Sequence, residues 1–108
     1  MRNGLYKVQF QTPNDIGYGV VFAQDGKMWG GDSAIYYVGS YSLDGDTLTA
    51  TVKTDVHSKY PGSGSVFGKD QVTIQITGTV NGDTINARGS SPQAPGIGFN
   101  ATMTRLAD

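Results

Sequence analysis

The 108-residue sequence contains no cysteine and no glutamate. Without cysteine it can form neither a disulfide nor a thiolate metal site, so the redox compartment is left open. All nine acidic residues are aspartates, which favour turns over helix interiors. Charged residues are scarce, at 16%, and the formal net charge is −1. This balance argues against direct binding of nucleic acid through electrostatics, and the 37% hydrophobic content argues against a membrane span.

What the chain does have is alternation of apolar and polar residues along its whole length. Within 47–56, Leu48, Ala50 and Val52 share one face, and threonines occupy the other. No window shows a sustained helical period, so the pattern predicts antiparallel sheet with one solvated face. The length fits a single domain, 1–108. The first residues lead directly into an alternating segment with no apolar signal region, so we expect a cytoplasmic location.

Turn dipeptides separate the alternating segments. Asp25-Gly26, Asp44-Gly45 and Asn81-Gly82 are typical of tight hairpins, and longer loops are expected at 58–70 and 90–96. We expect strands at 3–12, 16–24, 27–30, 35–43, 47–57, 71–80, 83–90 and 98–106. Because an open meander would leave two exposed edges, the sequence predicts an all-β, eight-stranded antiparallel up-and-down barrel. A two-sheet sandwich is the alternative.

The predicted inner face mixes bulky and small side chains. An eight-stranded barrel is just wide enough to be filled by side chains or to hold one small ligand. We expect a filled interior, with a cavity for an apolar small molecule as the alternative. The residues expected to line such a cavity are Tyr6, Phe10, Tyr37, Tyr41, Phe99 and Met103.

Two predicted strands, 16–24 and 35–43, are apolar on both faces. An apolar outer wall needs a cover, and a second copy of the chain is the simplest one. We therefore expect a homodimer surface that includes Val21, Tyr36 and Val38, with coverage by flanking loops as the alternative.

Residues that could carry catalysis are few. His57 is the single histidine, and Asp55 lies two positions earlier, on the same strand face if the alternation continues. One such pair is too little for a zinc site, which needs three or four ligands. The glycine-rich stretch 62–70 does not have the P-loop spacing. We expect no enzyme activity, no metal and no cofactor.

Two polar features remain. Gly30-Gly31-Asp32 predicts a structural corner, where glycines let the backbone turn and Asp32 accepts backbone N–H bonds. Asp44 and Asp46 form an acidic hairpin tip. Ordinary turn chemistry explains that tip most simply, and a binding determinant for a basic partner is the alternative.

The order of features in residues 3 to 52 is more distinctive than any single motif. Asn3-Gly4-Leu5-Tyr6 opens the first strand, and Gly17-Tyr18-Gly19-Val20-Val21-Phe22 forms the second. The segment 25–33 then contains Trp29-Gly30-Gly31-Asp32, and Tyr36-Tyr37-Val38-Gly39 follows it. This half of the chain resembles the GrlR family, small negative regulators of type III secretion gene expression.

The resemblance implies a lipocalin-like barrel that dimerises and acts by protein–protein contact. In enterobacterial members the repressor binds a transcriptional activator and withholds it from DNA, and an acidic run on a hairpin is implicated. The matching position here is Asp44-Gly45-Asp46, where two charges replace a continuous run of four.

Overall fold

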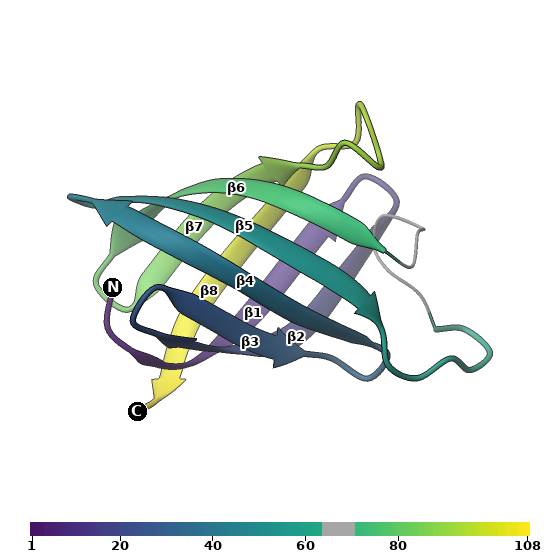
Figure 1. Ribbon diagram of the computed structural model, residues 1–108, viewed down its shortest axis with the longest axis horizontal. Coiled ribbons are helices and arrows are strands. Elements are labelled where there is room, and N and C mark those ends of the chain that lie inside the picture. The colour runs from purple at the N-terminus through teal and green to yellow at the C-terminus, as the bar shows by residue number, and fades with distance from the viewer. Residues whose placement is uncertain (64–70) are drawn as a thin grey trace.

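The computed structural model describes residues 1–63 and 71–108, which form eight strands closed into an antiparallel barrel (Figure 1). The strands are β1 (Gly4–Thr12), β2 (Asp15–Gln24), β3 (Lys27–Gly31), β4 (Ile35–Asp44), β5 (Thr47–Val56), β6 (Val72–Asn81), β7 (Thr84–Ser90) and β8 (Phe99–Ala107). Each strand pairs with its neighbours in sequence, and β8 returns to pair with β1. The predicted up-and-down barrel is confirmed, and the two-sheet sandwich is excluded.

All strand boundaries lie within one residue of those expected, because both the alternation and the turns are local signals. Residues 64–70, which make up most of the glycine-rich stretch 62–70 and the second half of the 58–70 loop, lie outside the described residues. In the part of the chain that is described, no helix has the length and apolarity needed to cross a membrane.

The hairpin turns use their glycines in two ways. In the β2–β3 turn both central residues, Asp25 and Gly26, have positive φ. In the β4–β5 and β6–β7 turns, Gly45 and Gly82 occupy the first loop position with φ near +60°, so Asp44 and Asn81 end their strands. Glycine at the first position of a two-residue loop satisfies that φ without a Cβ clash.

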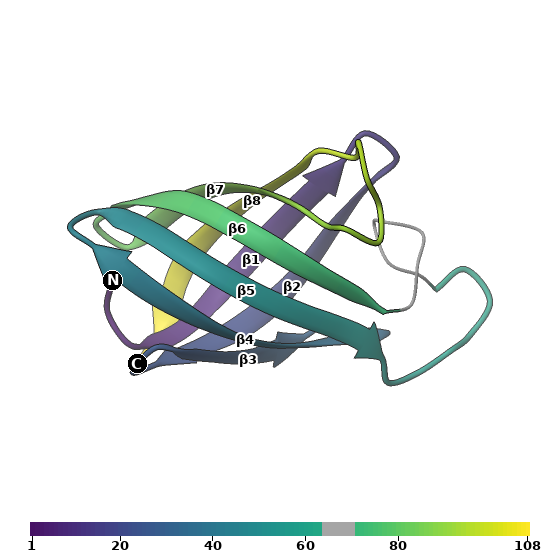
Figure 2. The same ribbon diagram turned by 45° about the horizontal axis from the view of Figure 1, so that its top comes forward.

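The barrel has two unlike ends (Figures 1 and 2). The three tight hairpins β2–β3, β4–β5 and β6–β7 lie at one end together with both termini, and we call this the hairpin end. The opposite end carries the β1–β2 turn, the β3–β4 corner and the connections that follow β5 and β7, and we call it the loop end.

Side chains fill the hairpin end. Tyr6, Leu48 and Ile85 are the largest fully buried residues, and the Tyr6 hydroxyl donates a 2.5 Å hydrogen bond to the backbone oxygen of Arg2. Burial is the main cause of the raised pKa of the Tyr6 hydroxyl. This end is a packed core tied to the N-terminal segment.

Candidate functional site

The barrel interior retains a cavity of about 140 Å³. Its wall is almost entirely apolar, and it extends to the rim of the loop end, where Asp15 and Ile16 are exposed. Residues lining it include Val8, Phe10, Val21, Ile35, Tyr37, Val52, Ile74, Ile76, Ala87, Phe99, Ala101 and Met103. The cavity therefore extends from the loop end as far as Met28 and Leu48, whose strands β3 and β5 begin at the hairpin end.

Four of the six residues predicted to line a cavity do so, namely Phe10, Tyr37, Phe99 and Met103. The prediction is wrong for Tyr6 and Tyr41, which are not among the lining residues. Both belong to the core or pack against it. Alternation identifies the inward face of a strand correctly, but it does not report how far along the barrel axis a residue lies.

An aromatic cluster forms one side of the cavity. The Phe10 ring meets Tyr37 edge-on at a centroid distance of 5.8 Å and stacks on Phe99 at 6.4 Å. Gly17, paired with Phe10 across β1 and β2, leaves the space for this ring, since a Cβ there would lie 2.4 Å from a Phe10 ring carbon. The sequence shows Gly17 only as a glycine within a strand, so its role in shaping the cavity was missed.

Asp32 fixes the corner between β3 and β4 at the cavity rim. Its Oδ1 accepts the backbone N–H groups of Ala34 at 2.9 Å and Ile35 at 2.8 Å, and its Oδ2 accepts the Tyr37 hydroxyl at 2.5 Å. The carboxylate thus accepts backbone N–H bonds as predicted, and it also positions an aromatic residue of the cavity wall.

The two corner glycines serve a different purpose from the one expected. Neither Gly30 nor Gly31 has positive φ, so no left-handed turn requires them. A Cβ on Gly30 would lie 2.0 Å from the backbone oxygen of Val20. The close approach of β2 to β3, and not a turn, is what requires a residue without a side chain.

The Tyr37 hydroxyl has a strongly raised pKa. Burial is the first cause, and its hydrogen bond to the Asp32 carboxylate is the second. The hydroxyl therefore stays protonated and continues to donate to Asp32 throughout the neutral range.

His57 is hydrogen-bonded to the same corner. Its Nε2 lies 2.8 Å from the backbone oxygen of Asp32, and its Nδ1 lies 2.8 Å from the Ser58 hydroxyl. The pairing with Asp55 considered from the sequence does not form, because the Asp55 carboxylate accepts from the Val56 N–H and from Gln71. No cluster of three metal-ligating side chains occurs in residues 1–63 and 71–108.

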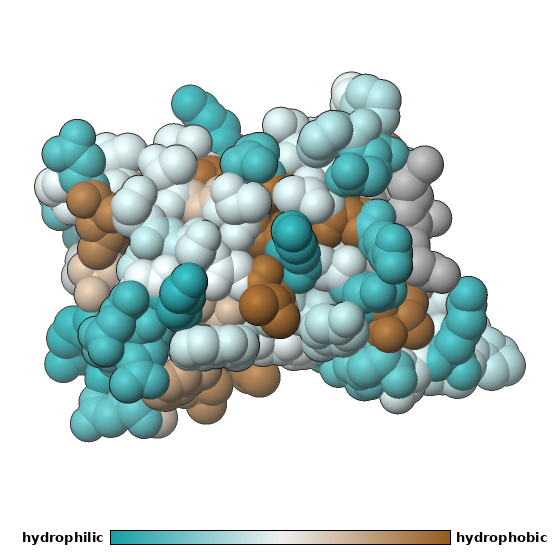
Figure 3. Space-filling model, in the orientation of Figure 1, coloured by the Kyte–Doolittle hydropathy of each residue, from teal (hydrophilic) through white to brown (hydrophobic). Residues whose placement is uncertain are grey.

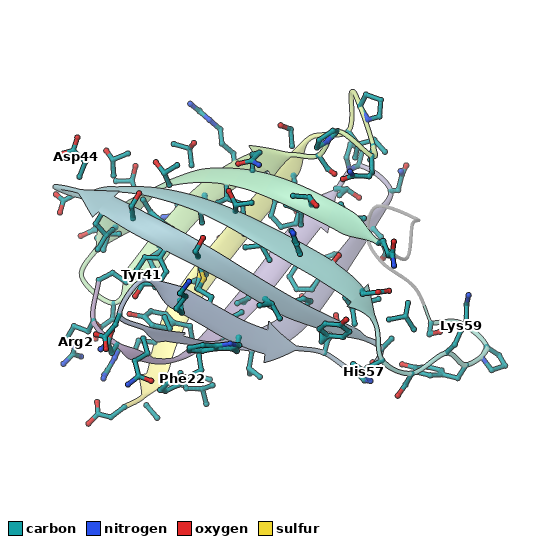
Figure 4. All side chains as sticks on the ribbon, in the orientation of Figure 1. Arg2, Phe22, Tyr41, Asp44, His57 and Lys59 are labelled. Atoms are coloured by element: carbon teal, nitrogen blue, oxygen red, sulfur yellow. The ribbon has the colours of Figure 1, made fainter. Side chains whose placement is uncertain are left out.

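The outer wall of β2, β3 and β4 is apolar. Tyr36 and Val38 are exposed on it, as expected, but the prediction for Val21 is wrong because that side chain is buried and lines the cavity. Because both faces of 16–24 are apolar, the alternation does not show whether Val20 or Val21 points outward. The outward residues on β2 and β3 are Tyr18, Val20, Phe22 and Trp29. Apolar atoms are exposed along the lower edge of the space-filling view, near the position of Phe22 (Figures 3 and 4).

The acidic hairpin lies at the tip of β4 and β5, at the opposite end of the barrel from His57 (Figure 4). Asp44 and Asp46 are both exposed, and no described hydrogen bond or ion pair engages either carboxylate. Nearby acids differ in this respect, since Asp83 pairs with Arg2 and Asp108 pairs with Arg105.

Comparison with known protein families and with curated proteins finds no match to this chain.

Proposed function

We propose that this protein is a non-enzymatic regulator that acts through protein–protein contact as a homodimer. The observation that carries the proposal is the exposed apolar face on β2–β4. Cross-strand pairing aligns Phe22 with Trp29 and Trp29 with Val38, and it brings Val20 and Tyr36 to either side of Gly31. Aromatic residues gathered on one exposed surface are typical of protein interfaces.

The closed barrel restricts how such a dimer can form. Every strand has a partner on each side, although residues 15–19 of β2 pair only with β1 because β3 reaches no further than Val20. With so little free edge, we expect association through the side chains of the exposed face, and two identical faces related by a two-fold axis give a closed dimer. Trp29, at the centre of the row, is the expected anchor.

Replacing Trp29 by aspartate is expected to abolish the dimer. The substitution buries an unpaired charge at the centre of the interface, which costs several kcal/mol. Size-exclusion chromatography with light scattering should show a dimer for the unaltered protein and a monomer for Trp29→Asp, with unchanged circular dichroism. Thr49→Asp, on the exposed face of β5, is the matched control and should remain dimeric. A monomeric unaltered protein at high concentration would refute the proposed dimer.

The acidic hairpin supplies the second contact in this proposal. Its two carboxylates lack neutralising partners among the described residues and project from the tight β4–β5 turn, which suits a basic surface on a partner protein. The resemblance of residues 3–52 to GrlR suggests a transcriptional activator as that partner, and sequestering it would repress its genes without direct contact with DNA.

Removing the hairpin charges is expected to reduce partner capture. Lysate of the source organism would be passed over immobilised protein carrying Asp44→Ala and Asp46→Ala together, and over the unaltered protein. Bound proteins would be quantified by mass spectrometry, with Asp15→Ala at the opposite end as a control for general loss of charge. We expect a specific partner to fall about tenfold with the double variant alone, since rim charge pairs contribute up to ~1 kcal/mol each. If the double variant still captured the partner in full, the hairpin carboxylates would have no binding role and would serve only to form the turn.

A second candidate function, carriage of a small apolar molecule, is favoured by the cavity. At about 140 Å³ it is close to the ~150 Å³ apolar cavities that bind benzene. Carriage of a small molecule would need no protein partner, so it can be tested separately from regulation through protein–protein contact.

A further inference from the structure

Two asparagines of the chain, Asn3 and Asn81, are followed by glycine, and the structure surrounds them differently. An asparagine before glycine is prone to lose its side-chain amide, because glycine has no side chain to shield its backbone nitrogen from the asparagine Cγ. Asn81 ends β6, and Gly82 begins the β6–β7 turn at the hairpin end. Both residues are exposed, and a Cβ on Gly82 would meet nothing within 4 Å. The Asn81 side chain therefore has room to turn onto the Gly82 nitrogen.

The reacting atoms of Asn81 and Gly82 are not held by other groups. Within residues 1–63 and 71–108, neither the Asn81 side-chain amide nor the Gly82 N–H takes part in a hydrogen bond. Attack on Cγ requires the Asn81 backbone to leave its extended conformation. Asn81 and Thr84 form the last pair of the β6–β7 ladder, and a terminal pair opens at little cost because no pair lies beyond it. The hairpin can thus reach the reactive geometry by opening one pair.

Asn3 has the same glycine neighbour and the opposite environment. Its Nδ2 donates to the Asp25 carboxylate at 3.1 Å, and its Oδ1 accepts the Asp25 N–H at 3.1 Å. Gly4 is buried, and a Cβ there would clash with the backbone oxygen of Ala107. The Asn3 side chain must therefore break two hydrogen bonds before it can turn towards a crowded nitrogen. The two sites are alike in sequence, and the structure protects only the first.

We propose that Asn81 is a modification site, at which spontaneous deamidation converts the side-chain amide to a carboxylate. The Gly82 nitrogen loses its proton and bonds to Asn81 Cγ, the Cγ–Nδ2 bond breaks, and ammonia leaves with that proton. Water then opens the cyclic imide at one of its two carbonyl carbons, which gives aspartate or isoaspartate. The reaction consumes one water molecule and involves no change of oxidation state.

The new carboxylate would lie beside the acidic hairpin. The Val80 N–H donates to the backbone oxygen of Asp46 at 2.8 Å, and Asn81 is the next residue along β6. Deamidation would add a third carboxylate to Asp44 and Asp46, which no described group engages. We expect it to strengthen capture of a basic partner. This consequence rests on the proposed function, whereas the modification itself does not.

Peptide mapping by mass spectrometry of the full chain, stored at mildly alkaline pH, measures the reaction at both sites. In the folded protein we expect Asn81 to deamidate at least about tenfold faster than Asn3, because Asn3 must first lose two hydrogen bonds. In urea the two sites should react at similar rates. Asp25→Gly keeps the positive φ of the turn and removes the carboxylate that holds Asn3, so it should speed the reaction at Asn3 about fivefold and leave Asn81 unchanged. Equal rates in the folded protein, or no reaction at Asn81, would overturn the inference.

The effect on partner capture has a separate test. Asn81→Asp supplies the product charge and should raise capture of the specific partner about threefold, whereas Asn14→Asp, the same change at the loop end, should have no effect. If Asn81 deamidates but Asn81→Asp captures no more partner, the regulatory consequence is wrong. If the double variant of Asp44 and Asp46 captures the partner in full, the proposed contact fails, while a faster reaction at Asn81 than at Asn3 still establishes the modification site.

Discussion

Asp32→Ala is expected to lower the free energy of unfolding by about 2–4 kcal/mol. The substitution removes the carboxylate that accepts three hydrogen bonds, from the N–H groups of Ala34 and Ile35 and from the hydroxyl of Tyr37. Ala34 and Ile35 are buried, so water can replace the lost bonds only in part. For a domain of this size the melting temperature should fall by roughly 10–20 °C, which differential scanning calorimetry would measure.

Two further variants test the cause of this loss. Asp44→Ala removes an exposed carboxylate without a described partner, and it should change stability by less than about 0.5 kcal/mol. Tyr37→Phe, alone and combined with Asp32→Ala, gives a double-mutant cycle. Because the two residues share a hydrogen bond, the combined loss should be smaller than the sum of the single losses by about 1 kcal/mol or more. Additive losses, or an unchanged melting curve for Asp32→Ala, would contradict a structural role for Asp32.

Gly30→Ala is expected to be the second large effect, at about 3 kcal/mol of destabilisation. The added Cβ would lie 2.0 Å from the Val20 oxygen and 2.8 Å from the Val21 Cα, and both atoms belong to the backbone of β2. No change of side-chain rotamer relieves such a contact, so β2 and β3 must move apart. Urea unfolding followed by circular dichroism would measure the loss.

Gly98→Ala is the matched control, because a Cβ there meets nothing within 4 Å and the residue has no positive φ. That substitution should leave stability unchanged or raise it by a few tenths of a kcal/mol by restricting the unfolded chain. If Gly30→Ala behaved like Gly98→Ala, the close approach of the two strands would not be the reason for glycine at position 30.

The two corner variants also bear on the cavity. Val21 lines it and pairs with Gly30, and Tyr37 lines it and donates to Asp32. A shift of Val21 caused by Gly30→Ala, or of Tyr37 caused by Asp32→Ala, would displace part of the cavity wall. The corner predicted from Gly30-Gly31-Asp32 as purely structural is therefore also what positions one side of the candidate ligand site.

The sequence predicted the fold well and the site in part. Strand positions followed from alternation and from turn residues, both of which act over a few neighbouring positions. The alternation indicates which residues face inward, and it correctly placed four residues in the cavity wall: Phe10, Tyr37, Phe99 and Met103. Tyr6 and Tyr41 were misplaced because their distance along the barrel axis depends on the register between strands, which spans the whole chain.

The sequence by itself determined an all-β chain of eight strands, the absence of disulfides, and an Asp32 that caps a corner. These follow from residue type and local spacing. Only the tertiary structure decided that Val21 points inward, that Gly17 leaves space for the Phe10 ring, and that Asp15 and Asp32 both line the cavity. Each of these depends on which residues closure of the barrel brings together, and closure joins strands from opposite ends of the sequence.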